Sequence, residues 1–291
     1  MRIHPAAGFL APALSALALF FVLPVAAAFL LSLTDFDLYA LADPGNLRFV
    51  GLRNYARLLA DPTFWRSFAN TLFFVAVGAP LSVGASFAAA LLLCARSARA
   101  QAFFRTVYFV PVVTTLVAVA VVWRFLYHPR LGLANRALGW LGLPPVDWLG
   151  DPAVAMPAII ALAVWKNFGF NMVIFVAGLQ AIPERLYEAA RLDGATRWQE
   201  LRSVTLPMLL PTTSFVVLMT LIGHFQLFAE PYLMTQGGPE DSTRSIVLLM
   251  YEQAFRWWNL GQASAIAVLL FGVVLVATLL ARSWRGGEVG A

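Results

Sequence analysis

Paired polar side chains stand inside apolar stretches of this chain, at spacings that place each pair on one face of a helix. Amide, hydroxyl and imidazole groups of this kind, beside aromatic rings, can hydrogen-bond to a hydroxylated solute such as a sugar. Hydrogen bonding between helices, worth about 0.6–2 kcal/mol per pair, is the alternative interpretation. The pairs are Asn167 with Asn171, Thr220 with His224, and Gln226 with Glu230, and the nearby rings are Phe170, Phe225 and Phe228.

Lys166 is the only lysine and the only formal charge within its apolar stretch. A charge in hydrocarbon is costly and usually faces the protein interior or reaches toward the interface. Two interpretations therefore stay open. Lys166 is either a cation on a substrate pathway, or a structural group that forms an ion pair or extends to the membrane surface.

The remaining reactive side chains form no catalytic or metal-binding pattern. His4, His128 and His224 are scattered, Cys94 is the only cysteine, and no H-E-x-x-H spacing occurs. A phosphate-binding G-x-x-x-x-G-K-[ST] loop is also missing, because no glycine frame precedes the single lysine. We therefore expect no catalytic residue, no metal and no cofactor in this chain.

The composition indicates an integral membrane protein. Hydrophobic residues make up 60% of the 291 positions and charged residues 12%, against about 25% charged in an ordinary soluble domain. Continuously apolar runs also exclude the alternating strands of a membrane barrel. The net charge of +5 is attributed to membrane orientation, without a nucleic-acid partner.

Six runs with little or no charge are long enough to cross about 30 Å of hydrocarbon. They cover residues 6–34, 67–95, 106–123 (extendable to 127), 153–183, 203–229 and 257–281. The first run is too long for the apolar region of a signal peptide, so we expect an uncleaved helix. The sequence thus predicts an all-α integral membrane fold with six transmembrane helices.

An even number of spans places both termini on the same side. The connections on that side would hold ten arginines, against nine in the longer opposite segments. The connection 95–105 carries three arginines and no acid. Because arginine and lysine concentrate in cytoplasmic loops, we expect both termini in the cytoplasm.

The segment 182–207 is the soluble-looking part of the cytoplasmic face, with four acidic and four basic residues between 184 and 202. Pro183 is suited to a helix start, and Gly194 to the left-handed stop of a helix over 184–193. Thr196 and Gln199 form a capping box for a second helix. That helix should end or kink near Leu206, because the residue before a proline disfavours the α conformation.

This segment resembles the EAA loop of binding-protein-dependent ABC transporter permeases. Leu201 and Val204 are mild departures, since the family more often has Phe and Ile there. A plain interfacial amphipathic helix is the competing interpretation. The matching positions are Glu188, Ala189, Ala190, Asp193, Gly194, Ala195, Leu206, Pro207 and Pro211.

The resemblance extends over nearly the whole chain and points to the sugar-permease branch, similar to the first permease of maltose and glycerol-3-phosphate type importers. The segments that carry it are 49–55, 61–64, 70–71, 165–171, 178–180, 237–239 and 251–255.

The resemblance implies a type I ABC importer-like permease whose EAA loop is a coupling helix. The implied partners are a second homologous permease, a dimeric cytoplasmic ATPase that binds ATP and Mg, a periplasmic or lipid-anchored solute-binding protein, and membrane lipid. The implied coupling residues are Glu188, Ala189, Ala190, Asp193, Gly194, Leu206 and Pro207. The candidate pathway residues are Lys166, Asn167, Asn171, Thr220, His224 and Gln226.

The expected organisation has three parts in a bacterial inner membrane. Residues 1–66 form the first helix and a periplasmic loop, residues 67–283 form a five-helix core that includes the coupling loop 182–207, and residues 284–291 form a cytoplasmic tail. A different small solute, for example glycerol phosphate or a polyamine, stays open within the same class. A secondary transporter is less favoured, because the halves do not repeat and no carboxylate lies mid-span.

Overall fold

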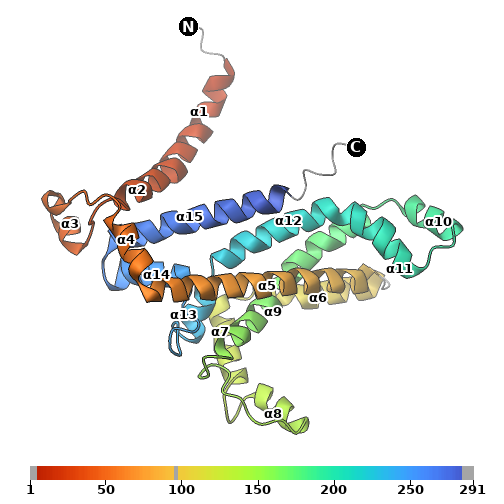
Figure 1. Ribbon diagram of the computed structural model, residues 1–291. Coiled ribbons are helices and arrows are strands. Elements are labelled where there is room, and N and C mark those ends of the chain that lie inside the picture. Colours follow the sequence, from red (N-terminus) through yellow and green to blue (C-terminus); the bar gives the residue numbers. More distant parts are fainter. Residues whose placement is uncertain (1–4, 95–97, 284–291) are drawn as a thin grey trace. The chain divides into compact units, whose positions relative to one another are not determined.

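The computed structural model describes residues 5–94 and 98–283 of the chain. Arg2, Arg96 and the expected tail 284–291 lie outside the described residues. The chain divides into two compact units, Met1–Trp65 with Ile246–Val273 and Arg66–Ser245 with Val274–Ala291. Within the described residues, β-pairing is confined to one isolated bridge between Thr34 and Phe49, so the all-α fold is confirmed (Figure 1).

The first unit is built from membrane-type helices joined by short surface helices. A π-turn, Ala18–Val22, joins the first two helices into a candidate span, Phe9–Leu31, whose most apolar part is 0% buried within the chain. This span therefore offers its whole circumference to lipid or to a partner. The unit contains α1 (Pro5–Leu17), α2 (Leu23–Leu31), α3 (Leu38–Ala42), α4 (Arg53–Ala60), α14 (Ile246–Tyr251) and most of α15 (Leu260–Ser283).

Asn54 and Gly261 fasten the end of α2 to its neighbours. The buried Asn54 amide donates hydrogen bonds to the carbonyls of Ser32 at 2.9 Å and Thr34 at 2.8 Å. The Gly261 N–H donates to the Phe36 carbonyl at 2.8 Å. A Cβ at Gly261 would collide with the Thr34 carbonyl, so glycine is required for this approach.

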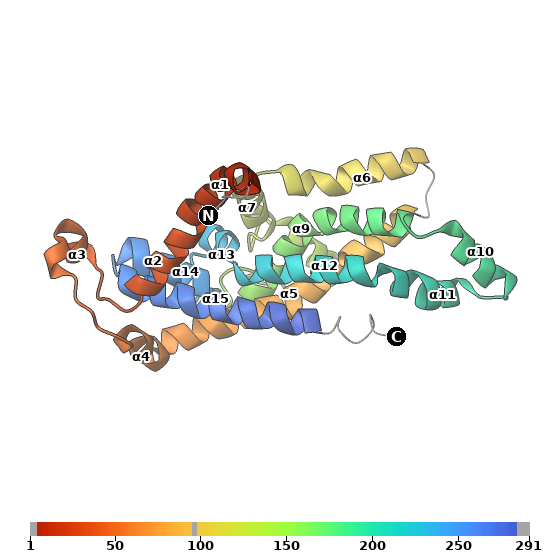
Figure 2. The same ribbon diagram turned by 90° about the horizontal axis from the view of Figure 1, so that it is seen from above.

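The second unit is organised around α9, which lies between α6 and α12 (Figure 2). Half of the most apolar part of α9 is buried, the largest share of any candidate span. The unit contains α5 (Pro62–Cys94), α6 (Ala98–Val113), α7 (Leu116–Leu126), α8 (Leu133–Trp140), α9 (Ala155–Gln180), α10 (Glu184–Leu192), α11 (Arg197–Glu200), α12 (Leu206–Phe225) and α13 (Ala229–Met234).

Five of the six expected spans are confirmed as helices long and apolar enough to cross a membrane. The third is not one straight helix. It consists of Gln101–Val113 and Leu116–Leu126, which meet at an angle of 97°. The bend lies at Thr115, whose backbone is extended (φ −62°, ψ 139°), shortly after Pro111, which cannot donate a helical hydrogen bond.

Lys166 satisfies the backbone that this bend exposes. Its ammonium group donates to the carbonyls of Pro111 at 3.1 Å and Thr114 at 3.0 Å, with Val112 at 3.5 Å. An ammonium has three donors, and the last carbonyls of a helix lack partners within the helix. The cation therefore closes the carboxyl end of α6.

Glycine at position 169 allows α9 to approach α6 one helical turn beyond Lys166. A Cβ at Gly169 would collide with the Tyr108 carbonyl and lie 3.3 Å from Val112 Cγ2. Nearby, the Ser86 hydroxyl on α5 donates to the Phe168 carbonyl at 2.9 Å. The two sides of this part of α9 are thus held by contacts with backbone carbonyls.

The helix that begins in the loop does not end at Leu206, and the irregularity expected there takes the form of a π-turn. One helix runs from Arg197 to Phe225. The π-turn Leu201–Thr205 precedes Pro207, and within it the Leu206 N–H donates to the Leu201 carbonyl, five residues back. Because Pro207 lies in the first turn of α12, where its missing N–H is tolerated, the helix continues.

Replacing Gly169 with Ala tests the close contact between α6 and α9. We expect Gly169→Ala to lower the apparent melting temperature of the purified transporter by several degrees, since either backbone must shift. Gly84→Ala is the matched control, because a Cβ at Gly84 on α5 meets no atom within 4 Å. Equal melting temperatures for the two variants would contradict the contact.

Replacing Lys166 tests its role at the bend. Lys166→Met keeps the length of the side chain but leaves the Pro111 and Thr114 carbonyls without this donor, so we expect a loss of about 1.5–3 kcal/mol. Lys166→Arg keeps a cationic donor and should recover much of the loss. The measurement is thermal unfolding of the purified transporter, and a Met variant as stable as the wild type would refute the role.

Candidate functional site

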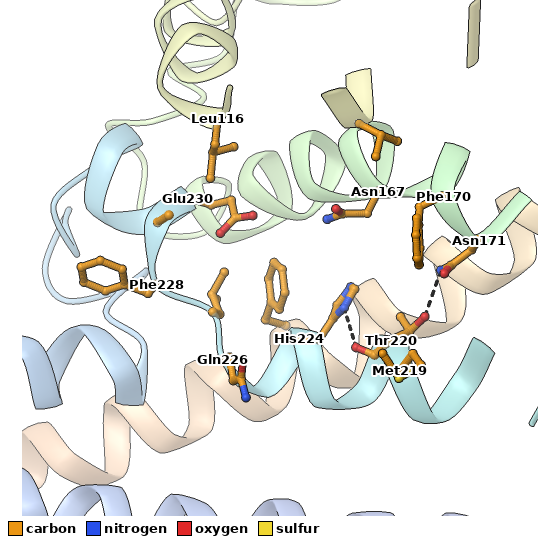
Figure 3. Close-up of a pocket in the computed structure, with 15 residues that line it drawn as sticks. Leu116, Asn167, Phe170, Asn171, Met219, Thr220, His224, Gln226, Phe228 and Glu230 are labelled. Carbon is orange, nitrogen blue, oxygen red and sulfur yellow. Dashed lines mark hydrogen bonds between the residues drawn. The ribbon is translucent and has the colours of Figure 1, made fainter. Parts of the chain in front are cut away.

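A cavity of about 530 Å³ opens in the second unit among α5, the α6–α7 bend, α9, α12 and α13 (Figure 3). All three polar pairs singled out from the sequence line it. Lys166 does not line it, because its ammonium is turned toward the bend. The polar lining residues are Asn167, Asn171, Thr220, His224, Gln226 and Glu230.

Asn171 and Thr220 join α9 to α12 at one end of the cavity. The Asn171 amide donates to the Thr220 hydroxyl oxygen at 2.9 Å, and both residues are buried. Hydrogen bonding between helices, the alternative considered for these pairs, thus accounts for this contact. Asn167, one turn away on α9, has an exposed side chain and lines the same cavity.

His224 lies between two backbone segments. Its Nδ1 lies 2.9 Å from the Thr220 carbonyl oxygen, which can only accept, so Nδ1 is the donor in this contact. Its Nε2 faces the backbone of α5 at Gly78. The ring lies 5.1 Å from the Phe74 ring and beside Gly78, where a Cβ would be 3.2 Å from Cδ2.

The apolar lining includes residues that the sequence did not single out. Phe74 comes from α5, and Val112 and Leu116 come from the two sides of the α6–α7 bend. No local sequence pattern predicts that Val112 and Leu116 line a cavity, because the bend that places them there is held by Lys166 of α9. Phe170 and Phe228 line the cavity as expected from the sequence, whereas Phe225 is buried outside its lining.

Glu230 lies in the first turn of the short helix α13 and points toward the cavity, near Leu116 (Figure 3). The residue is partly buried. Burial raises the pKa of its carboxyl group, while the Lys166 ammonium acts in the opposite direction. The backbone N–H of Glu230 itself also acts on this carboxyl group, and no ion pair of the group is found within the described residues.

The loop 182–207 has the expected helix–glycine–helix form. The first helix ends at Leu192, one residue before the expected end, and Gly194 adopts φ +79°. A Cβ at Gly194 would meet no atom within 4 Å, so only the backbone angle restricts this position. Both hydrogen bonds of the capping box are present: the Thr196 side chain accepts from the Gln199 N–H, and the Gln199 side chain accepts from the Thr196 N–H.

An ion pair crosses the glycine turn. Arg191 Nε donates to Glu200 Oε1 at 2.9 Å, and this contact raises the pKa of the arginine. A second contact, 3.0 Å between the hydroxyl groups of Tyr187 and Thr205, joins the first helix to the π-turn. These two contacts hold α10 against the segment that follows the glycine turn, once near the turn and once farther from it.

The predicted coupling residues fall in two groups. Four of them, Glu188, Ala189, Asp193 and Gly194, are exposed on α10 and the turn, while Ala190 is half-buried. Leu206 and Pro207 begin α12, beyond the π-turn. Two large apolar side chains that the sequence had not singled out, Leu192 and Trp198, are 89% and 68% exposed near the tip.

A search of the described residues for clustered histidine, cysteine and acidic side chains finds no group of three or more that could hold a metal ion.

Relatives of known annotation match over nearly the full length. The "Trehalose/maltose transport system permease protein MalF" of Thermococcus litoralis is 37% identical over 274 residues, covering 92% of this chain and 89% of the relative. The "Probable ABC transporter permease protein YurN" of Bacillus subtilis is 35% identical over 275 residues, covering 94% and 92%. The "Lactose transport system permease protein LacF" of Rhizobium radiobacter is 33% identical over 276 residues, covering 94% and 90%.

Solved structures show the same fold. A chain of a bacterial ABC transporter involved in importing the acidic polysaccharide alginate superposes with a TM-score of 0.83 at 24% identity, covering 98% of this chain and 96% of that one. The family model for "Binding-protein-dependent transport system inner membrane component" matches residues 82–284. The chain therefore belongs to this family of inner membrane components and is the membrane-spanning permease subunit of a binding-protein-dependent transport system.

Proposed function

We propose that this permease carries a sugar or an oligosaccharide, and that the cavity beside α9 and α12 is part of the pathway. The observation that carries the proposal is the meeting of six polar residues from α9, α12 and α13 with the aromatic rings of Phe74, Phe170 and Phe228. Sugars present many hydroxyl groups and apolar ring faces, which such a lining can match. The printed names of relatives, which include trehalose/maltose, lactose and arabinooligosaccharides, support this class.

The assembly that this function requires has three kinds of partner. A second homologous permease completes the pathway, a solute-binding protein delivers the solute, and a dimeric cytoplasmic ATPase binds ATP and Mg. A solved alginate transporter in complex with a ligand-bound periplasmic protein has a chain of the same fold. In this scheme both termini and the loop 182–207 are cytoplasmic, and residues 67–283 form the core.

Coupling to the ATPase is assigned to α10 and its glycine turn. The exposed Ala189 methyl group permits close approach of a partner backbone, and the Leu192 and Trp198 side chains offer apolar contacts. Adjacent exposed apolar side chains that form a patch are typical of protein interaction sites. We expect these residues to enter a cleft of the ATPase.

Alanine variants of the cavity test the pathway. We expect His224→Ala and Asn167→Ala to lower the initial uptake rate about 3- to 10-fold at saturating binding protein, which corresponds to one lost hydrogen bond in each case. The solute comes from an oligosaccharide screen on the binding protein that co-purifies with the transporter. Ser214→Ala, whose hydroxyl donates within α12 to the Leu210 carbonyl and does not line the cavity, is the control.

Uptake by both the His224→Ala and Asn167→Ala variants at the wild-type rate would remove the cavity from the pathway. A binding protein that takes only amino acids or ions would overturn the sugar assignment.

The glycine turn gives a separate test of coupling. Gly194→Pro fixes φ near −65° and removes the N–H that donates to the Arg191 carbonyl at 3.0 Å, so we expect loss of ATPase co-purification and of uptake. Gly194→Asn is the matched control, because asparagine tolerates the left-handed conformation and the adjacent space is open. Normal docking and normal uptake with proline would show that the loop has no coupling role.

A further inference from the structure

The cavity has one ionisable carboxylate and no ammonium or guanidinium group among the described residues that line it. Lys166 does not line the cavity, and its donors are directed to the Pro111 and Thr114 carbonyls, although its charge acts on the Glu230 carboxyl group from outside the lining. Nδ1 of His224 faces the Thr220 carbonyl. Glu230 is therefore the one carboxylate, and no lysine or arginine accompanies it, among the described residues that line this cavity.

A carboxylate in such a place treats neutral and anionic solutes differently. Sugar hydroxyl groups can donate to it, and hydrogen bonds to a charged acceptor are stronger than neutral ones. A uronate or phosphate would meet a like charge in a partly dehydrated space whose described lining residues include no lysine or arginine, and electrostatic energies there exceed those in water. Among the other polar lining residues, Asn167 and Gln226 carry amides, which bind either class of solute.

We infer that Glu230 is a specificity-determining residue that admits uncharged solutes to the cavity and excludes anionic ones. The inference rests on the proposed function, and it narrows the solute class to neutral glycans. The fold itself does not impose this choice, since a solved chain of the same fold belongs to an importer of an acidic polysaccharide.

Charged thiol reagents measure this selectivity without any knowledge of the natural solute. A single cysteine is introduced as Leu116→Cys, beside Glu230 in Figure 3, in a Cys94→Ala background of the complete detergent-purified transporter. Its rates of reaction with trimethylammonioethyl and sulfonatoethyl methanethiosulfonate are each divided by the rate for free cysteine. The ratio of the two normalised rates reports the local potential.

We expect the cationic reagent to be favoured, and Glu230→Gln to reduce this preference about tenfold, the size of effect that one nearby charge produces at an intermediate effective dielectric. Glu240→Gln removes the same charge from an exposed position outside the cavity and should leave the ratio unchanged. A second probe, Met219→Cys, lies farther from Glu230 along the cavity (Figure 3) and should show a smaller change.

An equal ratio for wild type and Glu230→Gln at both cysteines would overturn the inference, because the carboxyl group would then be neutral or screened. An equal effect of Glu240→Gln would overturn it as well. Failure of the proposed sugar function appears elsewhere, as wild-type uptake by the His224→Ala and Asn167→Ala variants, and leaves the reagent ratio intact.

Discussion

Backbone carbonyls inside a hydrocarbon layer need hydrogen-bond donors, which lipid tails do not supply. The break in the third span, between Val113 and Leu116, leaves such carbonyls without partners in their own helix. A membrane tolerates irregular backbone only if protein satisfies its polar groups. Lys166 does so from the neighbouring helix, with contacts of 3.0 to 3.5 Å to the end of α6. This interaction holds the bend, and the bend brings Val112 and Leu116 to the wall of the cavity. The shape of the site thus depends on a cation that does not line it.

The helix α9 combines the roles that the second unit requires. Its side toward α6 carries Lys166 for the bend and Gly169 for close backbone contact. Another part of its surface carries Asn171, which donates to Thr220 on α12. Substitutions on this helix will therefore act on packing and on the cavity together, and stability measurements are needed beside transport measurements to separate the two.

Local patterns were sufficient for the helices and for the loop. Apolar run length located five spans, and the Gly194 stop and the Thr196–Gln199 capping box depend on residues within a few positions of one another. The 97° bend at Thr115 could not be derived from local patterns, because its stabilising donor is more than fifty residues away in sequence. The proline rule predicted an end or a kink near Leu206 but not a π-turn, since it considers one residue pair and not the register of the preceding turn. Sequence spacing also identified every polar pair of the cavity, but it could not separate Asn171, which bonds to Thr220, from the more accessible Asn167.

The unbroken helix from Arg197 to Phe225 has a mechanical consequence. Its 29 residues extend about 44 Å at 1.5 Å per residue, with Trp198 at one end and His224 at the other. The Arg191–Glu200 and Tyr187–Thr205 contacts bind α10 to the first turns of this rod. If the loop and this helix tilt as one body, a tilt of about 5° moves the far end by about 3–4 Å. That displacement is comparable to the width of a hydroxyl group and its hydrogen bond, so a small rotation at the loop is enough to open or close the contacts that a solute would make.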